Sequence, residues 1–285
     1  MILITGATGN TGSAAVQELS SRNIPFRALI RNKDKQSQIT DLGGEVIIGA
    51  IEDDGALNQA MEGVQKTLVL LPNSEQQLFL EKKIVDTALA ANVQHIVKIS
   101  SMEAVPEATS PIPKLHMQSE NYIKNSGMSW TMIKPNFFMQ NLLGSGKTIV
   151  EQNKFFLPMG EGKAGMIHTK DVGTVIAKVL SEDGHEGQNY EVTGPEILSF
   201  HDVAEIFSRT LGKKVDYINV PIDEYKKTLS QFLTNQWHLD SVIDLFKGIA
   251  AGGIEDKTNT FQDLMGKSPC SLEQFIQEYS FVFNA

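Results

Sequence analysis

The chain has 285 residues, of which 41 % are hydrophobic and 21 % are charged, and its formal net charge is −9. These values are ordinary for a globular protein with a sizeable core, and the negative charge argues against nucleic acid or an anionic membrane surface as the main partner. Cys270 is the only cysteine, which excludes an intrachain disulfide framework and a cysteine-based metal site. Because no apolar run approaches the length of a membrane span and no leader is evident, we expect a cytoplasmic protein. The six histidines include no i, i+4 pair and have no cysteine nearby, so we expect no metal site.

The chain opens on an apolar stretch, residues 2–5, that leads into three glycines and then into a segment of helical pattern. A strand that turns on glycines into a helix leaves backbone N–H groups unpaired at the positive end of the helix dipole. The spacing is G-x-x-G-x-x-G rather than the usual G-x-G-x-x-G. It still predicts a binding site for the pyrophosphate of a dinucleotide. The first glycine lets the chain turn out of the strand, the second lets the backbone approach a phosphate, and the third lets the helix pack close to the sheet. The expected contact residues are Gly6, Thr8, Gly9, Asn10, Thr11 and Gly12.

Short apolar runs alternate with longer amphipathic segments from residue 1 to about residue 135. The apolar runs cover residues 2–5, 26–30, 46–48, 67–71, 95–99 and 130–133, and helical patterns such as 75–91 lie between them. Strands that alternate with helices in this way predict βαβ units and an α/β fold with a doubly wound parallel sheet of the Rossmann type. We expect residues 1–135 to form the dinucleotide-binding domain, with a contribution from 166–193.

The pattern changes after Pro135, which closes the sixth predicted strand. Residues 136–165 are rich in Gly, Phe and Met, and after them we expect helices over 171–180 and 200–211, strands over 189–193 and 214–220, and mostly helices to the end. The interval 136–285 is therefore predicted to be mainly a smaller, helix-rich substrate lobe. One apolar stripe in the tail is either core or a surface for a regulatory protein partner: Trp237, Leu239, Val242, Ile243 and Phe246.

The end of the second predicted strand indicates which dinucleotide is bound. In NAD-binding folds an acid at this point holds the ribose 2′-hydroxyl, but no acid occurs here between positions 18 and 34. Arg31 stands in its place with Lys35 nearby, and a guanidinium pairs with a 2′-phosphate through two charge-assisted hydrogen bonds. The alternative is that Asn32 caps the next helix and the basic side chains merely face water. We favour NADP(H) over NAD(H).

Several motifs together resemble the NmrA-like group of atypical short-chain dehydrogenases/reductases, particularly its bacterial NAD(P)H:quinone oxidoreductase and triphenylmethane reductase types. The motifs are GATGNTG at 6–12, Arg31-Asn32, ISS at 99–101, IKPNFFMQN at 133–141, HTKDV at 168–172 and YEVTG at 190–194. The resemblance implies that the nicotinamide lies against the segments that follow strands four, five and six. The residues implied as cofactor contacts are Leu71, Pro72, Ser100, Ser101, Pro135, Asn136 and Phe137.

Two departures from the family pattern affect the chemistry. The third strand ends in Gly49-Ala50 where similar proteins carry Gly-Asp, so either Glu52 or Asp53 replaces the carboxylate beside the adenine or that contact is lost. The Tyr-x-x-x-Lys pair of ordinary short-chain dehydrogenases is also absent, because Ile112 and His116 occupy the corresponding positions. No phenol is therefore available to protonate a carbonyl oxygen.

A site with a reduced nicotinamide but no strong acid suits an easily reduced, flat acceptor. Hydride transfer to a quinone or a conjugated dye spreads or cancels charge, so proximity can suffice. We expect an NADPH-dependent reductase whose apolar substrate slot is formed by Met102, Phe138 and Met166. His116 is the candidate catalytic residue, with simple packing as its alternative.

Two other functions stay open at this point. One is a non-enzymatic NADP(H)-binding redox sensor, and the other is a carbonyl reductase that uses His116 as its acid. A homodimer is also compatible with the sequence.

Overall fold

The computed structural model describes residues 1–284, and the chain divides into two compact units. The first unit comprises Met1–Pro106, Pro113–Lys134 and Thr169–Glu191. The second comprises Glu107–Ile112, Pro135–His168 and the residues from Val192 onward. The segment Glu107–Ile112 thus belongs to the second unit, whereas the sequence pattern assigned it to the first domain.

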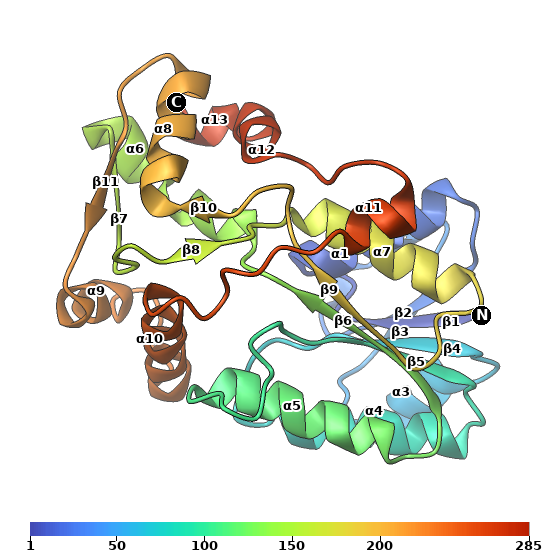
Figure 1. Cartoon of the computed structure of the whole chain (residues 1–285). Coiled ribbons are helices and arrows are strands. Elements are labelled where there is room, and N and C mark those ends of the chain that lie inside the picture. Colours follow the sequence, from blue (N-terminus) through green and yellow to red (C-terminus); the bar gives the residue numbers. More distant parts are fainter. Residues whose placement is uncertain (285) are drawn as a thin grey trace. The chain divides into compact units, whose positions relative to one another are not determined.

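A seven-stranded sheet organises the first unit (Figure 1), with the strand order β3-β2-β1-β4-β5-β6-β9. The register pairs all run parallel from β3 through to β6. This order reverses between β1 and β4, as expected for a doubly wound fold, and it confirms the Rossmann-type prediction. The strands are β1 (Ile2–Thr5), β2 (Phe26–Ile30), β3 (Glu45–Ile48), β4 (Lys66–Val69), β5 (His95–Ile99), β6 (Ser129–Pro135) and β9 (Gln188–Val192).

The fourth strand ends two residues before the predicted limit at position 71. The Thr5 side chain accounts for this earlier end, because the backbone N–H of Leu70 donates to Thr5 Oγ1 (3.0 Å) and not to a backbone carbonyl of a neighbouring strand. Thr5 Oγ1 in turn donates to the carbonyl oxygen of Leu68 (2.8 Å). These bonds join the ends of β1 and β4 at the point where the strand order reverses.

Helices cover the sheet of the first unit. On one face α1 (Asn10–Ser21) packs along α7 (Thr169–Ser181), so closely that a Cβ on Gly173 would lie 2.6 Å from the Cβ of Ala14. Helices α4 (Gln77–Ala90) and α5 (Pro111–Lys124) lie on the opposite face in Figure 1. The remaining helical segments are η1 (Lys33–Lys35), α2 (Ser37–Thr40) and α3 (Asp54–Met61). Both the predicted helix at 75–91 and the one at 171–180 are present, the second beginning two residues earlier.

The second unit is built from short strands and many helices, as the sequence predicts. β7 (Lys154–Leu157) pairs in parallel with β11 (Asp216–Asn219), and β8 (Lys163–Ala164) pairs antiparallel with β10 (Leu198–Ser199). The helices are η2 (Met139–Ser145), α6 (Gly146–Gln152), α8 (Phe200–Leu211), α9 (Ile222–Leu229), α10 (Gln236–Ala250), α11 (Thr260–Met265), α12 (Leu272–Glu278) and α13 (Ser280–Phe283). Helix α8 has the predicted bounds because a Ser199–Asp202 capping box starts it and Gly212 in the left-handed conformation ends it.

An aromatic core fills the second unit. Phe155 packs against both Phe207 and Tyr217, and Phe207 contacts Phe283 edge to face. Most of the apolar tail stripe in α10 is turned inward, with Leu239 and Ile243 buried and Phe246 packed against this core. The stripe therefore serves mainly as core.

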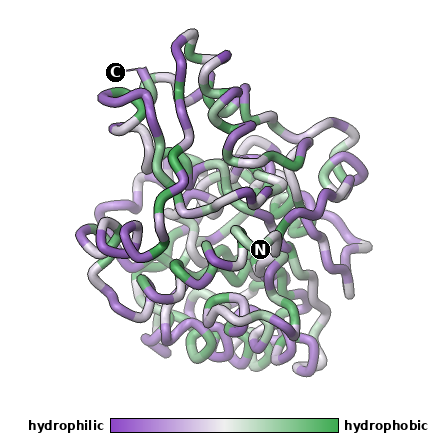
Figure 2. The backbone as a smooth tube through the Cα atoms, turned by 60° about the vertical axis from the view of Figure 1, so that its left-hand side comes forward, coloured by the Kyte–Doolittle hydropathy of each residue, from purple (hydrophilic) through white to green (hydrophobic). Residues whose placement is uncertain are grey.

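The helices alternate between hydrophilic and hydrophobic residues along their length, as Figure 2 shows. That pattern is typical of helices that pack one side against a sheet or core and expose the other. No helix within residues 1–284 combines the length and the apolar character needed to cross a membrane.

Candidate functional site

The glycine turn follows β1 directly, and two of its three glycines are required by the backbone. Gly6 has a φ of +68°, and a Cβ there would lie 2.5 Å from the carbonyl oxygen of Leu70. A Cβ on Gly12 would overlap the carbonyl oxygen of Gly6. Gly9 differs, because a Cβ there meets nothing nearer than 3.5 Å. The turn is thus fixed by close backbone approaches at Gly6 and Gly12, while Gly9 faces outward.

The N-terminus of α1 has no side chain to satisfy it. Gly9 is the N-cap, no side-chain hydrogen bond caps the helix, and its first turn carries no acidic residue. Gly9 and Asn10 are exposed and Thr8 is partly exposed, whereas Thr11 is largely buried. Unpaired N–H groups at the positive end of a helix dipole form a seat for an anion. This arrangement fits a diphosphate at the strand-order reversal, where ligands of such sheets bind.

The residues after β2 remain available to a ligand. Arg31 and Lys35 are both exposed, and within residues 1–284 neither side chain is committed to an ion pair. Asn32 caps η1 by accepting from the Asp34 N–H (2.9 Å). The capping part of the alternative interpretation is therefore present, and it leaves the Arg31 guanidinium accessible at the strand end.

The carboxylates near the end of β3 have different roles. Asp53 is the N-cap of α3, and its Oδ1 accepts from the N–H groups of Gly55 (2.9 Å) and Ala56 (3.1 Å). The side chain of Glu52 is exposed, and its backbone carbonyl accepts from Lys83 Nζ (2.6 Å). Of the two expected replacements for the missing aspartate, Glu52 is the one that is not already holding a helix end.

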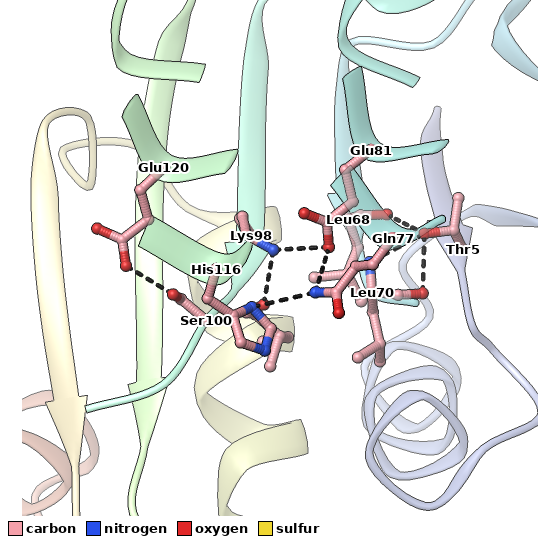
Figure 3. A network of polar contacts seen from close by, with 10 residues as sticks. Thr5, Leu68, Leu70, Gln77, Glu81, Lys98, Ser100, His116 and Glu120 are labelled. Atoms are coloured by element: carbon pink, nitrogen blue, oxygen red, sulfur yellow. Dashed lines mark hydrogen bonds and ion pairs between the residues drawn. The ribbon is translucent and has the colours of Figure 1, made fainter. Parts of the chain in front are cut away.

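A buried polar network lies behind the ends of β4 and β5 (Figure 3). Lys98 on β5 is 0 % exposed, and its Nζ lies 2.7 Å from Glu81 Oε1 on α4. Glu81 Oε1 also accepts from Gln77 Nε2 (3.2 Å), and the same Gln77 nitrogen lies 3.3 Å from His116 Nδ1. His116, the candidate catalytic residue, is 8 % exposed. It is therefore held in a polar cluster rather than in a purely apolar core.

Ser100 leads from the end of β5 into a second part of this network. Its Oγ donates to Glu120 Oε1 (2.6 Å), and its backbone N–H donates to the carbonyl oxygen of Ile133 (2.8 Å). Glu120 also pairs with Lys124 and Lys134, each at 3.0 Å. The hydroxyl and the backbone N–H of Ser100 thus both donate within the protein, which fixes this residue at the end of β5.

Two titratable groups near the end of β5 have shifted pKa values. Burial, together with the charges of Lys98 and Lys134, holds the pKa of His116 well below its usual range. Burial raises the pKa of Glu103 to about 7, although a hydrogen bond from Ser101 acts in the opposite direction. A carboxyl of this kind is typical of functional sites. Sequence reasoning missed Glu103, and its place two residues after Ser101 was the only available signal.

Four more predicted contact residues lie in the first unit and are at least partly exposed: Leu71, Pro72, Ser101 and Met102. The remaining predicted contact residues belong to the second unit. Pro135 ends β6, and the next side chain, Asn136, donates to the Ile254 carbonyl oxygen (3.1 Å) and accepts from the Phe137 N–H (2.7 Å). Phe137 packs edge to face on Phe200. Two residues of the expected substrate slot lie in this unit. Met166 is 1 % exposed and belongs to the core, whereas Phe138 is partly exposed.

The sheet order and the glycine turn define an α/β protein of the Rossmann type. The chain belongs to the NmrA-like family, whose model matches residues 1–276.

Its relatives include several reductases. The chain is 30 % identical over 285 residues to the NAD(P)H azoreductase of Xenophilus azovorans, with 100 % of both chains covered. It is 29 % identical over 291 residues to quinone oxidoreductase 2 of Escherichia coli strain K12, covering 100 % of this chain and 99 % of that protein. A crystal structure of NADPH-dependent quinone oxidoreductase from Escherichia coli, complexed with NADPH, matches with a TM-score of 0.89 at 27 % identity, covering 98 % of this chain and 100 % of that one.

Proposed function

We propose that this protein is an NADPH-dependent reductase that transfers hydride directly to a quinone-like or other conjugated acceptor. The observation that carries the proposal is the uncapped glycine turn between β1 and α1, with an accessible arginine at the end of the neighbouring β2. Relatives named NAD(P)H azoreductase and quinone oxidoreductase, matched over nearly their whole length, support an oxidoreductase.

The residues present fit this dinucleotide. The N–H groups at the start of α1, directly after the glycine turn, would hold the diphosphate, and Arg31 with Lys35 would pair with a 2′-phosphate. Leu71, Pro72 and the backbone at residues 100–101 would border the nicotinamide. When bound, the reduced nicotinamide supplies the hydride.

The positions that hold a Tyr-Lys pair in other reductases carry no strong proton donor here, which favours an acceptor that can be reduced without one. Within α5, Ile112 is buried and apolar, and His116 is neutral at pH 7 because its pKa is low. Neither can act as the phenol of a Tyr-Lys pair does. Reduction of a quinone or azo compound spreads the developing charge, so positioning supplies much of the rate. Glu103, two residues after Ser101 and partly protonated near pH 7, would supply the proton that completes the reduction.

Steady-state oxidation of NADPH with a panel of quinones and azo dyes tests this function. We expect turnover with at least one conjugated acceptor and little with simple ketones. Binding of NADPH without turnover of any acceptor would overturn the reductase and favour the alternative, a redox sensor that binds the dinucleotide without consuming it.

A further inference from the structure

Gln77 is a fully buried amide between a carboxylate and an imidazole. It is the first residue of α4, and its Nε2 contacts both Glu81 Oε1 (3.2 Å) and His116 Nδ1 (3.3 Å), as Figure 3 shows. The hydride transfer proposed above assigns no role to this amide. Its position nevertheless determines where the proton of His116 lies.

The charge of Glu81 fixes the orientation of the amide. Because Glu81 Oε1 is ion-paired with Lys98 Nζ at 2.7 Å, this carboxylate is an acceptor only. The amide must turn its NH₂ group toward it, since the amide oxygen would be repelled. The second N–H of that group then points at His116 Nδ1, which must accept. A neutral imidazole that accepts at Nδ1 carries its proton on Nε2.

The surrounding charges keep this ring neutral. Lys98 on β5 and Lys134 on β6 both oppose a second positive charge, and burial acts in the same direction. The facing carboxylates do not compensate, because Glu81 is paired with Lys98 while Glu120 is paired with Lys124 and Lys134. Between pH 6 and 8 the ring can therefore donate a hydrogen bond but has no extra proton to give.

The His116 ring lies near the edge of the sheet where a ligand is expected to bind. Each of α4 and α5 follows a parallel strand, so their first turns lie at the carboxyl edge of the sheet, where ligands of such folds bind. Gln77 begins α4, and His116 lies in the second turn of α5. Since Gln77 occupies Nδ1, any hydrogen bond from the ring to a ligand is made by Nε2–H.

We propose that Gln77 is a positioning residue that fixes His116 as a neutral Nε2–H donor to the acceptor atom that becomes anionic as hydride arrives. This role rests on the proposed reductase function. The reduced nicotinamide, when bound, would supply a hydride with both electrons of its C–H bond to the acceptor, and the Nε2–H group of His116 would stabilise the resulting anion by a hydrogen bond. His116 keeps its proton throughout, and the proton that completes the reduction comes from Glu103 or water.

Nitrogen NMR of protein labelled with ¹⁵N-histidine tests the proton position without any turnover. In the unmodified protein we expect His116 to show a protonated Nε2 and an unprotonated Nδ1 at every pH from 6 to 8. In Gln77→Met, Nδ1 loses its donor and the signal should shift toward a mixture of the two neutral forms. An imidazolium or a protonated Nδ1 at pH 7 in the unmodified protein would overturn the assignment.

Kinetics test the donor role, with the exposed neighbour Gln76 as a matched control. Removing one hydrogen-bond donor to a developing charge costs on the order of 10²-fold in kcat, so we expect about that loss in His116→Leu and a smaller one in His116→Gln, which keeps an N–H. Gln77→Met should lower kcat about tenfold with KM for NADPH unchanged, and Gln76→Met should change neither. Full kcat in His116→Leu would overturn the donor role, whereas failure of the unmodified protein to reduce any acceptor would instead overturn the reductase function.

Discussion

The glycine turn and the buried network around His116 lie in the same unit, but their sequences reveal them to very different degrees. The constraints on the turn act between residues that are close along the chain or next to the end of the neighbouring strand. The Gly6 carbonyl group excludes a side chain at position 12, and the carbonyl oxygen of Leu70, just after β4, excludes one at position 6. The network instead joins three elements, α4, β5 and α5, across 39 residues from Gln77 to His116. Local backbone requirements leave a motif in the sequence, whereas a cluster built by packing does not.

The largest expected effect breaks the network at its centre. Lys98→Met leaves the Glu81 carboxylate buried without its cation, so we expect the free energy of unfolding to fall by about 3–5 kcal/mol. The double variant Lys98→Met/Glu81→Gln removes both charges and should recover most of that loss, which denaturant unfolding would measure. If Lys98→Met alone is as stable as the unmodified protein, the pair is not buried as described.

A pH titration of stability tests a second buried histidine, at the opposite end of β5. Burial, with a contribution from Lys66, lowers the pKa of His95 from 6.5 to about 4. The folded state then binds fewer protons than the unfolded state between pH 6.5 and 4, so stability is present above pH 6.5 and is lost as the pH falls through that window. The loss is up to about 3 kcal/mol. Unfolding of His95→Gln should show a shallower pH dependence; an identical slope would contradict the assignment.

A matched pair of glycine variants separates folding from binding at the turn. Gly12→Ala forces a Cβ onto the Gly6 carbonyl oxygen and should lower the free energy of unfolding by about 2 kcal/mol. Gly9→Ala has room for its Cβ, so we expect stability within about 0.5 kcal/mol of the unmodified protein but weaker NADPH binding. Thermal unfolding and dinucleotide titration of both variants provide the comparison. Unchanged NADPH affinity in Gly9→Ala would show that no phosphate approaches this residue.

Replacing the strand-end arginine has a smaller effect, confined to one cofactor. Arg31→Ala removes charge-assisted hydrogen bonds and should weaken NADPH binding by about 2 kcal/mol while leaving NADH binding nearly unchanged. Lys35→Ala removes the second cation expected at the 2′-phosphate and should have the smaller effect, because an ammonium lacks the paired donors of a guanidinium. Equal losses for NADPH and NADH in Arg31→Ala would contradict the assignment of the 2′-phosphate.

The sequence predicted the parallel sheet and the approximate ends of most of its strands, because short apolar segments that alternate with amphipathic ones are typical of βαβ units. Pro135 marked the end of the sixth strand and the apolar period marked the helix over 200–211, and the structure confirms both. The charged Lys98 gave no sign of complete burial, since its partner Glu81 is provided by a helix that packs only in the fold. Met166 was expected to border a substrate and lies in a closed core, because apolar residues near a site and apolar core residues look alike in sequence.

The central claim is that the turn after β1 holds the diphosphate of a dinucleotide. Titration calorimetry of the purified protein with NADPH and with NADH tests it most directly. The account predicts saturable binding of both with a marked preference for NADPH, reduced by Gly9→Ala. An absence of binding heat with either dinucleotide, confirmed by unchanged thermal stability in their presence, would contradict it.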